Sequence, residues 1–552
     1  MKIIDGQIFK KMVISGANHL YNHYPEIDAL NVFPVPDGDT GMNMNLTMSS
    51  GAKEVINRND TNIGVISKSF SRGLLMGARG NSGVITSQIF RGIADGLEGK
   101  ESVNAIDLAY AIDNGRKVAY KAVIKPVEGT ILTVIRESSS FLLENVTEKT
   151  SIENAFEILL KEAKASLKRT PNLLPVLKEV GVVDSGGAGL VRIFEGMYSV
   201  LLGEFIEKNE VTALGKKGAL QSSIEEIKES EGYSIEFALK LGPKDKKKEF
   251  QRNRFFSVLN SHGKDLKINQ NDDIVKVSIH SLNPGNILSY AQDYGEFLQL
   301  SIVNTDSVKD PEVAKKIDQM DDSSEITKEE KKDYAIVATS SGDGIDEMFK
   351  EIGVTNIVAG GQTMNPSTED FLKEIKKSNS RVCYVLPNNS NIIMAANQAQ
   401  QVLKDECDVR VIPSKTIMQG IVSAMMFTPD VNADENFDSM SQALSSVKSG
   451  SVTFSIKDTD INGVHVSKDE FLAIRESKQI LSSCKDKNDA LYVLLKNMVD
   501  EESSIITILI GKDINDDEEK EMKKVIEEKY SDFDVDIRKG NQPIYSYIVG
   551  VE

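Results

Sequence analysis

The sequence is poor in the residues that build disulfide frameworks and metal clusters. Its 552 residues include three cysteines, Cys383, Cys407 and Cys484, which lie far apart and form no Cys-x-x-Cys pair. An odd and scattered set of this kind excludes a disulfide framework and a four-cysteine zinc site. Five histidines leave little room for histidine-rich metal chemistry. Because disulfides are not expected, we place the protein in the reducing cytoplasm.

Long apolar runs and an excess of positive charge are also missing. No run of 18 apolar residues occurs, so we expect no transmembrane segment. The first 13 residues carry Asp5 and lysines where a signal peptide needs an apolar core. The 65 Lys and Arg residues stand against 83 Asp and Glu residues, which gives a net charge of −18. Nucleic acids and anionic membranes are therefore not expected as main partners.

The chain has the length and patterning of a protein with several domains. At 552 residues, with 40% hydrophobic residues, it predicts about three to five folded domains. Up to about residue 205 the apolar residues recur at helical spacing, and in 151–169 they form one continuous face. The pair Thr170-Pro171 predicts the start of a further helix, which would end near Gly181.

The second half of the chain has a different pattern. IVKVSIH at 274–280 alternates apolar and polar residues, as a half-buried strand does. Residues 309–333 hold 15 charged residues in 25 and no aromatic one, which predicts a solvated linker. After residue 334, strand-like and helix-like segments alternate, which is typical of an α/β domain with a parallel sheet.

The strongest signal for chemistry is NVFPVPDGDTGMNMN at 31–45. Asp37 and Asp39 are separated by one glycine, on a loop that two prolines stiffen. Short oxygen ligands on a stiff loop suit Mg²⁺, which shares phosphate oxygens with a bound nucleotide. Asn31 and Thr40 would add neutral oxygen contacts. The alternative is a surface turn, because Asp-Gly-Asp is common in turns.

Three further loops join small residues to polar ones. In GLLMGARGNSGVI (73–85), glycines surround Arg79, Asn81 and Ser82, and small residues let backbone N–H groups approach phosphate oxygens. It is not a P-loop, and a plain turn between helices is the alternative interpretation. KPVEGTILTV (125–134) and EVGVVDSGGAGL (179–190) follow the same pattern. Four such loops between amphipathic helices predict a site at one end of a helical bundle.

Taken together, these motifs carry a family resemblance. NVFPVPDGDTGMNM, GLLMGARGNSG, KPVEGTILTV and NLLPVLKEVGVVDSGG resemble the DhaL (Dak2) nucleotide-binding domain, and the whole layout is similar to the bacterial fatty acid kinase catalytic-subunit family. The resemblance implies a multidomain fold that opens with an all-α DhaL-like helical barrel binding ATP and two Mg²⁺ ions. The implied parts are the barrel over 1–205, an α/β middle domain over 225–308, a charged linker over 309–333 and an α/β C-terminal domain over 334–552.

The resemblance also assigns roles to individual residues. The metal loop maps to Asp37 and Asp39, with Asn31 adjacent, and these aspartates with Thr40 and Arg79 form the implied catalytic set. Arg79 would add positive charge near the transferring phosphoryl group, with a purely structural cation as the alternative. The implied nucleotide contacts are Asn31, Thr40, Asn43, Gly80, Asn81, Ser82, Gly83, Thr130, Asp184, Ser185 and Gly186.

The reaction implied by the resemblance is phosphorylation of a fatty acid to an acyl phosphate, which feeds exogenous fatty acids into phospholipid synthesis. A separate fatty-acid-binding carrier of the DegV type (FakB) would present the substrate and dock on the C-terminal domain. A fatty carboxylate is ionised at neutral pH and needs no general base, so transfer depends on positioning and on Mg²⁺. The alternatives are a dihydroxyacetone-kinase-like phosphotransferase acting on a small hydroxylated substrate and a nucleotide-sensing scaffold.

The middle domain departs from the family pattern. Relatives hold a structural zinc with one cysteine and two histidines, and the matching positions here are Ser234, Ser278 and His280. Serine hydroxyls are poor ligands for Zn²⁺, so we expect no zinc. The resemblance further implies that this domain forms a homodimer.

Two weaker features leave alternatives open. His19 and His23 stand four residues apart on a predicted helix, a spacing that can bind metal or serve structure alone. TSSGDGIDEMF (339–349) follows a predicted strand, so Gly342 and Gly344 either cup an anion or form an ordinary strand-to-helix loop.

Overall fold

The computed structural model divides the described part of the chain into two compact units. One unit combines 1–209 with 331–552, and the other spans 210–330. Asp37 and most of the predicted linker lie outside the described residues. The described residues are 1–32, 38–209, 233–242, 250, 252–260, 263–271, 273–281, 284–304, 331–361, 364–455, 458–461, 463–476 and 479–552.

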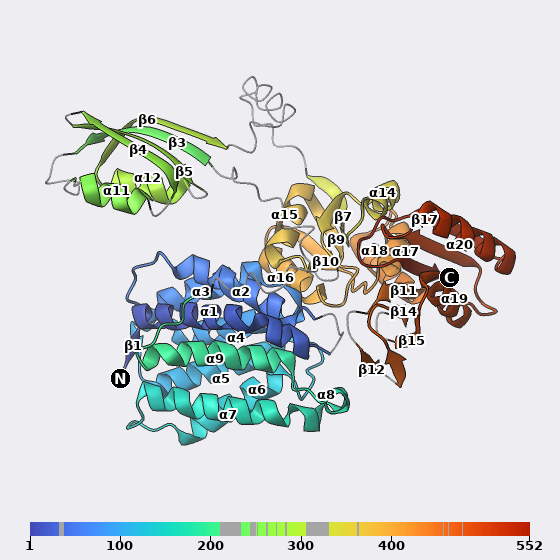
Figure 1. Cartoon of the computed structure of the whole chain (residues 1–552), viewed down its shortest axis with the longest axis horizontal. Coiled ribbons are helices and arrows are strands. Elements are labelled where there is room, and N and C mark those ends of the chain that lie inside the picture. Colours follow the sequence, from blue (N-terminus) through green and yellow to red (C-terminus); the bar gives the residue numbers. More distant parts are fainter. Residues whose placement is uncertain are drawn as a thin grey trace. The chain divides into compact units, whose positions relative to one another are not determined.

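The N-terminal part of the first unit is a closed ring of helices (Figure 1). Each long helix packs against the next, and the last packs against the first, which closes the ring. Only a two-residue pairing of β1 (Ile4–Asp5) with β2 (Ser102–Val103) interrupts it among the described residues. The helices are α1 (Gly6–Leu30), α2 (Thr40–Val55), α3 (Ile63–Gly77), α4 (Gly80–Leu97), α5 (Ala105–Ala122), α6 (Ile131–Asn145), α7 (Ile152–Leu173), α8 (Pro175–Val180) and α9 (Ser185–Leu201). The predicted all-α first domain is confirmed.

Local signals in the sequence explain these helices. Polar side chains cap their starts: the Asn104 side chain accepts the Asp107 N–H in a capping box, and the Ser151 hydroxyl accepts that of Asn154. The apolar faces form one continuous buried core inside the ring. In the part of the chain that the structure describes, no helix has the length and apolar character needed to cross a bilayer.

The predicted helix start at Thr170-Pro171 is wrong. Helix α7 continues through both residues to Leu173. Pro171 lacks the N–H that would bond the Leu167 carbonyl, but the Thr170 hydroxyl donates to that carbonyl instead, at 2.7 Å. The chain then turns into the short α8, which ends at Gly181 with φ of 74°, as the glycine predicts.

The C-terminal part of the first unit begins with a four-stranded parallel sheet in the order β10-β9-β7-β8, which confirms the predicted α/β pattern. On β7, Ala335 and Val337 face a core shared with α15 and α16, whereas Ile336 and Ala338 face a core shared with α14 and α17. The strands are β7 (Lys332–Ser340), β8 (Asn356–Ala359), β9 (Ser380–Leu386) and β10 (Asp408–Val411), and the helices are α14 (Asp343–Glu351), α15 (Thr368–Ser378), α16 (Ile393–Leu403), α17 (Ile417–Met425) and α18 (Ala433–Gln442).

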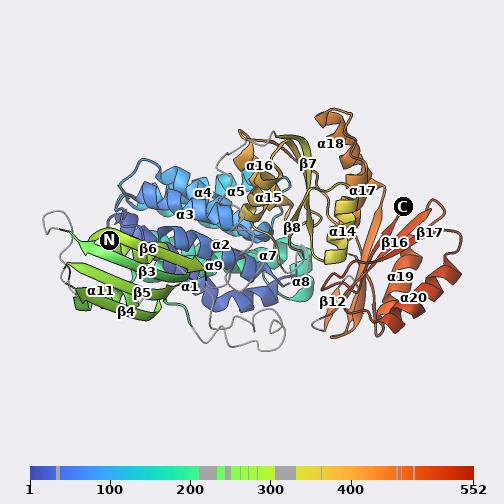
Figure 2. The same ribbon diagram turned by 90° about the horizontal axis from the view of Figure 1, so that it is seen from above.

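A second lobe follows in the same unit, as the sequence predicts. Its six-stranded mixed sheet runs in the order β15-β14-β11-β18-β16-β17, with a small β12–β13 hairpin beside it. Helices α19 and α20 share a core with strands of this sheet (Figure 2). The elements are β11 (Lys448–Phe454), β12 (Thr459–Ile461), β13 (Val464–Val466), β14 (Phe471–Arg475), β15 (Gln479–Cys484), α19 (Lys487–Met498), β16 (Ile505–Ile510), α20 (Asp516–Lys529), β17 (Asp534–Lys539) and β18 (Tyr547–Val551).

The second unit is a small α/β fold, as predicted. Four antiparallel strands in the order β4-β5-β3-β6 pack on two helices. Strand β5 alternates buried and more exposed residues, which confirms the half-buried strand expected there. The elements are β3 (Tyr233–Leu241), α11 (Arg252–Asn260), β4 (Lys264–Asn271), β5 (Ile274–Ser281), α12 (Pro284–Gln292) and β6 (Gly295–Asn304).

The tightest helix crossings in the ring predict where added volume is not tolerated. A Cβ atom on Gly92 of α4 would lie 2.5 Å from the Asn114 carbonyl oxygen of α5. We expect Gly92→Val to destabilise the ring by about 2 kcal/mol through overpacking. Thermal unfolding followed by circular dichroism measures this. Arg91→Val is the matched control, because it places the same side chain at an exposed position of the same helix. Equal melting temperatures for the two variants would contradict the prediction.

Candidate active site at one end of the helical ring

Four helix N-termini meet at one end of the ring. Helices α2, α4, α6 and α9 begin there because neighbouring helices alternate in direction, and the four glycine-rich loops predicted to build a site precede these starts. The Ser185 hydroxyl donates to the Thr40 hydroxyl at 3.2 Å, which ties the start of α9 to that of α2. Each N-terminus carries partial positive charge and N–H groups without intrahelical partners. The arrangement therefore favours an anion with several oxygens, such as a polyphosphate.

Asp39 is the buried carboxylate of this end. It immediately precedes α2, is 8% exposed, and its side chain makes no capping hydrogen bond to that helix. Its Oδ2 instead accepts a hydrogen bond of 2.6 Å from the amide of Asn365. Asn31, predicted beside the metal, ends α1 and is 3% exposed. A carboxylate among amides and hydroxyls is a donor set that suits Mg²⁺.

The turn into α4 is built by glycine. Gly80 adopts φ of 59°, and a Cβ there would lie 2.6 Å from the Asn43 amide nitrogen. Thr47, which also accepts the Arg79 N–H at 3.3 Å, leaves no room for a Cβ on Gly83. These contacts bring the start of α4 against α2 and place Asn43 beside the turn. Asn81 and Ser82 follow at the half-exposed start of α4.

Arg79 lies at the site but points to the C-terminal domain. Its guanidinium donates to the Asn365 carbonyl oxygen at 2.8 Å and lies 3.5 Å from Asp370. Asn81 likewise reaches Asn391, at 3.5 Å. These contacts favour the structural-cation alternative for Arg79.

The start of α9 carries an unusual carboxyl group. Asp184 is 5% exposed and caps α9 by accepting the Gly187 N–H at 2.7 Å. Burial away from water raises the pKa of Asp184 to about 6, although the backbone N–H groups of Gly187 and Ile131 act in the opposite direction. Gly186 lies against Ile131, so α9 and α6 begin side by side.

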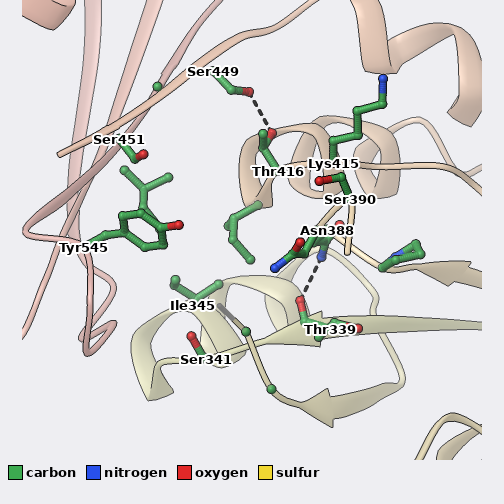
Figure 3. A pocket seen from close by; sticks show the side chains of 17 residues that line it. Thr339, Ser341, Ile345, Asn388, Ser390, Lys415, Thr416, Ser449, Ser451 and Tyr545 are labelled. Carbon is green, nitrogen blue, oxygen red and sulfur yellow. Dashed lines mark hydrogen bonds between the residues drawn. The ribbon is translucent and has the colours of Figure 1, made fainter. Parts of the chain in front are cut away.

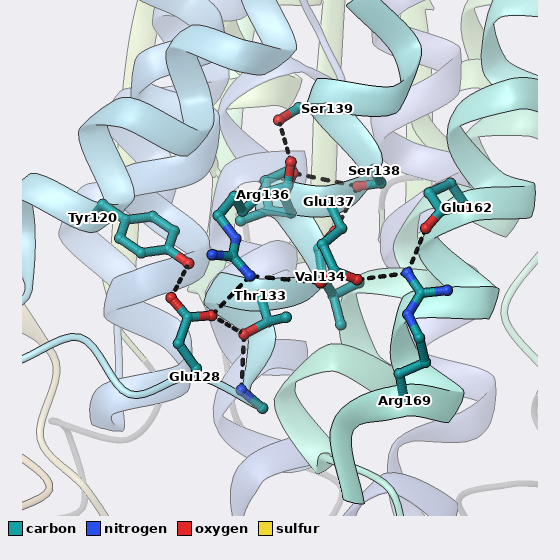
Figure 4. Close-up of polar contacts among 12 residues, drawn as sticks. Tyr120, Glu128, Thr133, Val134, Arg136, Glu137, Ser138, Ser139, Glu162 and Arg169 are labelled. Carbon is teal, nitrogen blue, oxygen red and sulfur yellow. Dashed lines mark hydrogen bonds and ion pairs between the residues drawn. The ribbon is translucent and has the colours of Figure 1, made fainter. Parts of the chain in front are cut away.

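A polar network holds the loop before α6 (Figure 4). The two Glu128 oxygens accept from the Tyr120 hydroxyl at 3.1 Å and from the Thr133 hydroxyl at 2.5 Å, and Arg136 pairs with Glu128 at 3.1 Å. Thr133 also accepts the Gly129 N–H at 2.8 Å. Thr130 follows directly and caps α6, so this network fixes a residue of the predicted site.

Sequence reasoning missed two residues at this end. Asp28 on α1 accepts the N–H groups of Gly41 and Met42, at 2.7 and 3.1 Å, and so caps α2 from a neighbouring helix. Its position just before the Asp-Gly-Asp motif was an available signal. Asn365 comes from a loop 326 residues further along the chain than Asp39, and nothing local marks it.

The weaker sequence features have structural roles. His19 lies 3.2 Å from Glu195, and its carbonyl oxygen contacts the His23 ring. Gly342 and Gly344 lie against the backbone of 539–541, which leaves no space for Cβ atoms, so they serve the close approach of the two C-terminal lobes.

The predicted zinc positions lie on neighbouring strands. The register pairs Ser234 of β3 with His280 of β5, and Ser278 lies two residues before His280. Among the described residues, which exclude Asp37, no group of three or more His, Cys, Asp or Glu side chains is placed to hold a metal ion.

A second cleft lies between the two lobes of the C-terminal domain (Figure 3). Residues that follow the parallel strands line one side, and Ser449–Ser451 with Tyr545 line the other. The Thr416 and Ser449 hydroxyls lie 2.8 Å apart across it. Such an edge of a parallel sheet is a common ligand position.

Comparisons with known proteins agree with this architecture. Models of three domain families match, described as DAK2 domain (34–199), fatty acid kinase FakA-like middle domain (230–310) and fatty acid kinase FakA-like C-terminal domain (335–552). Protein YloV of Bacillus subtilis is 42% identical over 560 residues, and the match covers all of both chains. The chain belongs to the FakA-like family of fatty acid kinase proteins. It is therefore a member of a kinase family.

Solved structures give weaker likenesses. A dihydroxyacetone kinase from C. freundii, in complex with AMP-PNP and Mg²⁺, is 19% identical with a TM-score of 0.28, over 35% of this chain and 33% of that chain. DegV, a fatty acid binding protein from Bacillus subtilis, is 11% identical with a TM-score of 0.30, over 40% of this chain and 99% of that chain.

The raised pKa of Asp184 predicts a pH-dependent stability difference. Between the ordinary carboxyl pKa near 4 and the folded value of about 6, the folded state holds the proton more tightly, so wild-type stability falls as the pH rises. The asparagine of the variant Asp184→Asn keeps the cap but does not ionise. We expect its melting temperature to rise relative to wild type from pH 4 to pH 7, by an amount equivalent to about 2 kcal/mol. A pH-independent difference would contradict this.

Proposed function

We propose that this chain is the catalytic subunit of a fatty acid kinase, which transfers the γ-phosphoryl group of ATP to a fatty acid held by a separate carrier protein. The observation that carries the proposal is the meeting of four helix N-termini around the buried Asp39, in a chain whose middle and C-terminal domains both match fatty acid kinase families. The match of those two domains favours this substrate class over a small hydroxylated ketone.

The ring end suits the charge of a triphosphate. The helix starts at Thr40, Gly80, Ile131 and Ser185 present N–H groups and positive dipole ends to phosphate oxygens. Asp39, together with Asp37, would hold Mg²⁺, which neutralises charge on the phosphates when bound. Thr40 and Ser185 are linked hydroxyls that would orient the phosphate chain.

The transfer step needs no proton acceptor. A carboxylate oxygen of the fatty acid attacks the γ-phosphorus, the bond between that phosphorus and the β–γ bridging oxygen breaks, and ADP leaves with the electron pair. The nucleophile is already ionised at neutral pH, so positioning and electrostatic stabilisation dominate the rate. His19, which contacts Glu195, lies on α1 away from the described loops of this end.

The same proposal includes the partners expected from the family. A DegV-type carrier would present the fatty acid and dock on the C-terminal domain, and the middle domain would form a homodimer. Two Mg²⁺ ions and ATP are the expected cofactor and substrate. We expect the middle domain to be stable without zinc, because serine hydroxyls replace ligands at Ser234 and Ser278.

The decisive test is transfer of labelled γ-phosphate from ATP to oleate in the presence of a DegV-type carrier from the same source. Asp39→Asn and Asp37→Asn are expected to lower the rate by about 100-fold or more, because each removes charge from the metal site. Asp95→Asn, at an exposed carboxylate of α4, is the control and should transfer at the wild-type rate.

The outcomes separate the alternatives. Clear Mg·ATP binding with no transfer to any carrier-bound fatty acid would contradict the proposal. Transfer to dihydroxyacetone would support the small-substrate kinase, and nucleotide binding without any turnover would support the sensing scaffold.

A metal analysis tests the middle domain. We expect the purified protein to contain no stoichiometric zinc, and a zinc chelator to leave its melting temperature unchanged, since the usual thiolate ligand is missing. One zinc ion per chain, removed with a fall in melting temperature, would contradict the prediction.

A further inference from the structure

The loop between β8 and α15 reaches the candidate active site of the ring. Its Asn365 is 2% exposed, and its amide nitrogen lies 2.6 Å from Asp39 Oδ2 and 3.4 Å from Asn43 Oδ1. The same nitrogen lies 3.5 Å from the position of a Cβ on Gly80. One side chain of the C-terminal domain thus touches three residues expected to bind metal and phosphate.

The backbone of this loop is held firmly in place. Arg79 donates to the Asn365 carbonyl oxygen, and the Thr368 N–H donates to the Ala78 carbonyl oxygen at 3.2 Å. Arg79 and Ser367 also form an isolated antiparallel bridge. Because these bonds fix the chain on both sides of Asn365, its side chain has little freedom to leave Asp39.

An apolar core supports the same contact. Ala78 and Val84 of the ring are buried in one cluster with Phe371 of α15 and Ala395 of α16. Gln398 adds a hydrogen bond of 3.3 Å to the Ser87 hydroxyl. A buried core of this kind is typical of a permanent contact and not of a latch that opens in each cycle.

The chemistry of the amide suits a role beside a metal ligand. Only the amide nitrogen can donate to a carboxylate, so Oδ1 of Asn365 faces away from Asp39 Oδ2, and it is buried with no hydrogen-bond partner among the described residues. Leaving a buried acceptor unpaired is costly, which suggests that a ligand completes its bonding. A neutral donor also fixes the Asp39 carboxylate without competing for phosphate through added negative charge.

We propose that Asn365 is a positioning residue of the kinase site, supplied by the C-terminal domain. It holds the Asp39 carboxylate in the orientation that binds Mg²⁺, so metal-dependent nucleotide binding by the ring depends on the C-terminal domain. The inference rests on the proposed function, because it assumes that the ring binds Mg·ATP.

Calorimetry on the full chain tests it without any carrier or turnover. AMP-PNP binding is measured over a series of Mg²⁺ concentrations, and the readout is the Mg²⁺ concentration that half-saturates binding. Asn365→Ala is expected to raise this concentration about ten-fold, the usual effect of losing a hydrogen bond to a charged group. Asn365→Asp keeps the size of the side chain but replaces the donor with a carboxylate, and should weaken AMP-PNP binding at least as much.

Gln398→Ala is the matched control. It removes another buried hydrogen bond between the same two parts of the chain but does not touch Asp39. We expect it to lower the melting temperature and to leave the Mg²⁺ dependence unchanged within about two-fold, since the hydrogen bond it removes is remote from the metal ligands. A similar shift in Gln398→Ala and Asn365→Ala would show a merely structural role and overturn the inference.

Each remaining outcome is informative. Unchanged or tighter Mg²⁺-dependent binding in Asn365→Ala would overturn the inference, the tighter result because it would make the loop a competitor of the metal. If Asn365→Ala does not fold, Asn365→Asp decides, and wild-type binding by that folded variant would also overturn the inference. Failure of the wild-type protein to bind AMP-PNP would instead contradict the proposed function.

Discussion

The central constraint on this molecule is electrostatic. An up-and-down ring of helices places four N-termini at one end, and their dipoles and unpaired N–H groups concentrate positive potential there. Such an end is stable only if polar groups satisfy it. Asp28, Asp184 and Thr130 cap individual helices, and the remaining capacity faces the space beside Asp39. The anion-binding character of the site follows from the topology before any single side chain is considered.

Close packing of the ring serves this electrostatic arrangement. Helix starts can share one anion only if the helices approach closely, and glycine makes that approach possible at several crossings. A Cβ on Gly189 of α9 would lie 2.5 Å from the Met44 sulfur of α2, and Gly80 leaves room for the Asn43 amide. Larger residues at these points would separate the helix starts and weaken the shared site.

The C-terminal domain contributes to two separate places through one loop. Gly360 and Gly361 line the cleft between its lobes, and Asn365, a few residues later, lies against Asp39. Arg79 ties the same loop to the start of α4. The ring is thus completed by a domain of another fold class, and a change at the cleft has a short covalent route to the residues around Asp39.

The sequence determined the elements themselves, because helical and alternating periodicities, caps and glycines act over short distances. It predicted the all-α ring, the parallel sheet of β7–β10, and the four loops that gather at one end. It failed at Thr170-Pro171, where a hydroxyl replaces the missing backbone donor and α7 continues. Only the tertiary structure decided that Arg79 faces Asp370 and that Asn365 meets Asp39, since these contacts join residues hundreds of positions apart and depend on how two folded parts pack.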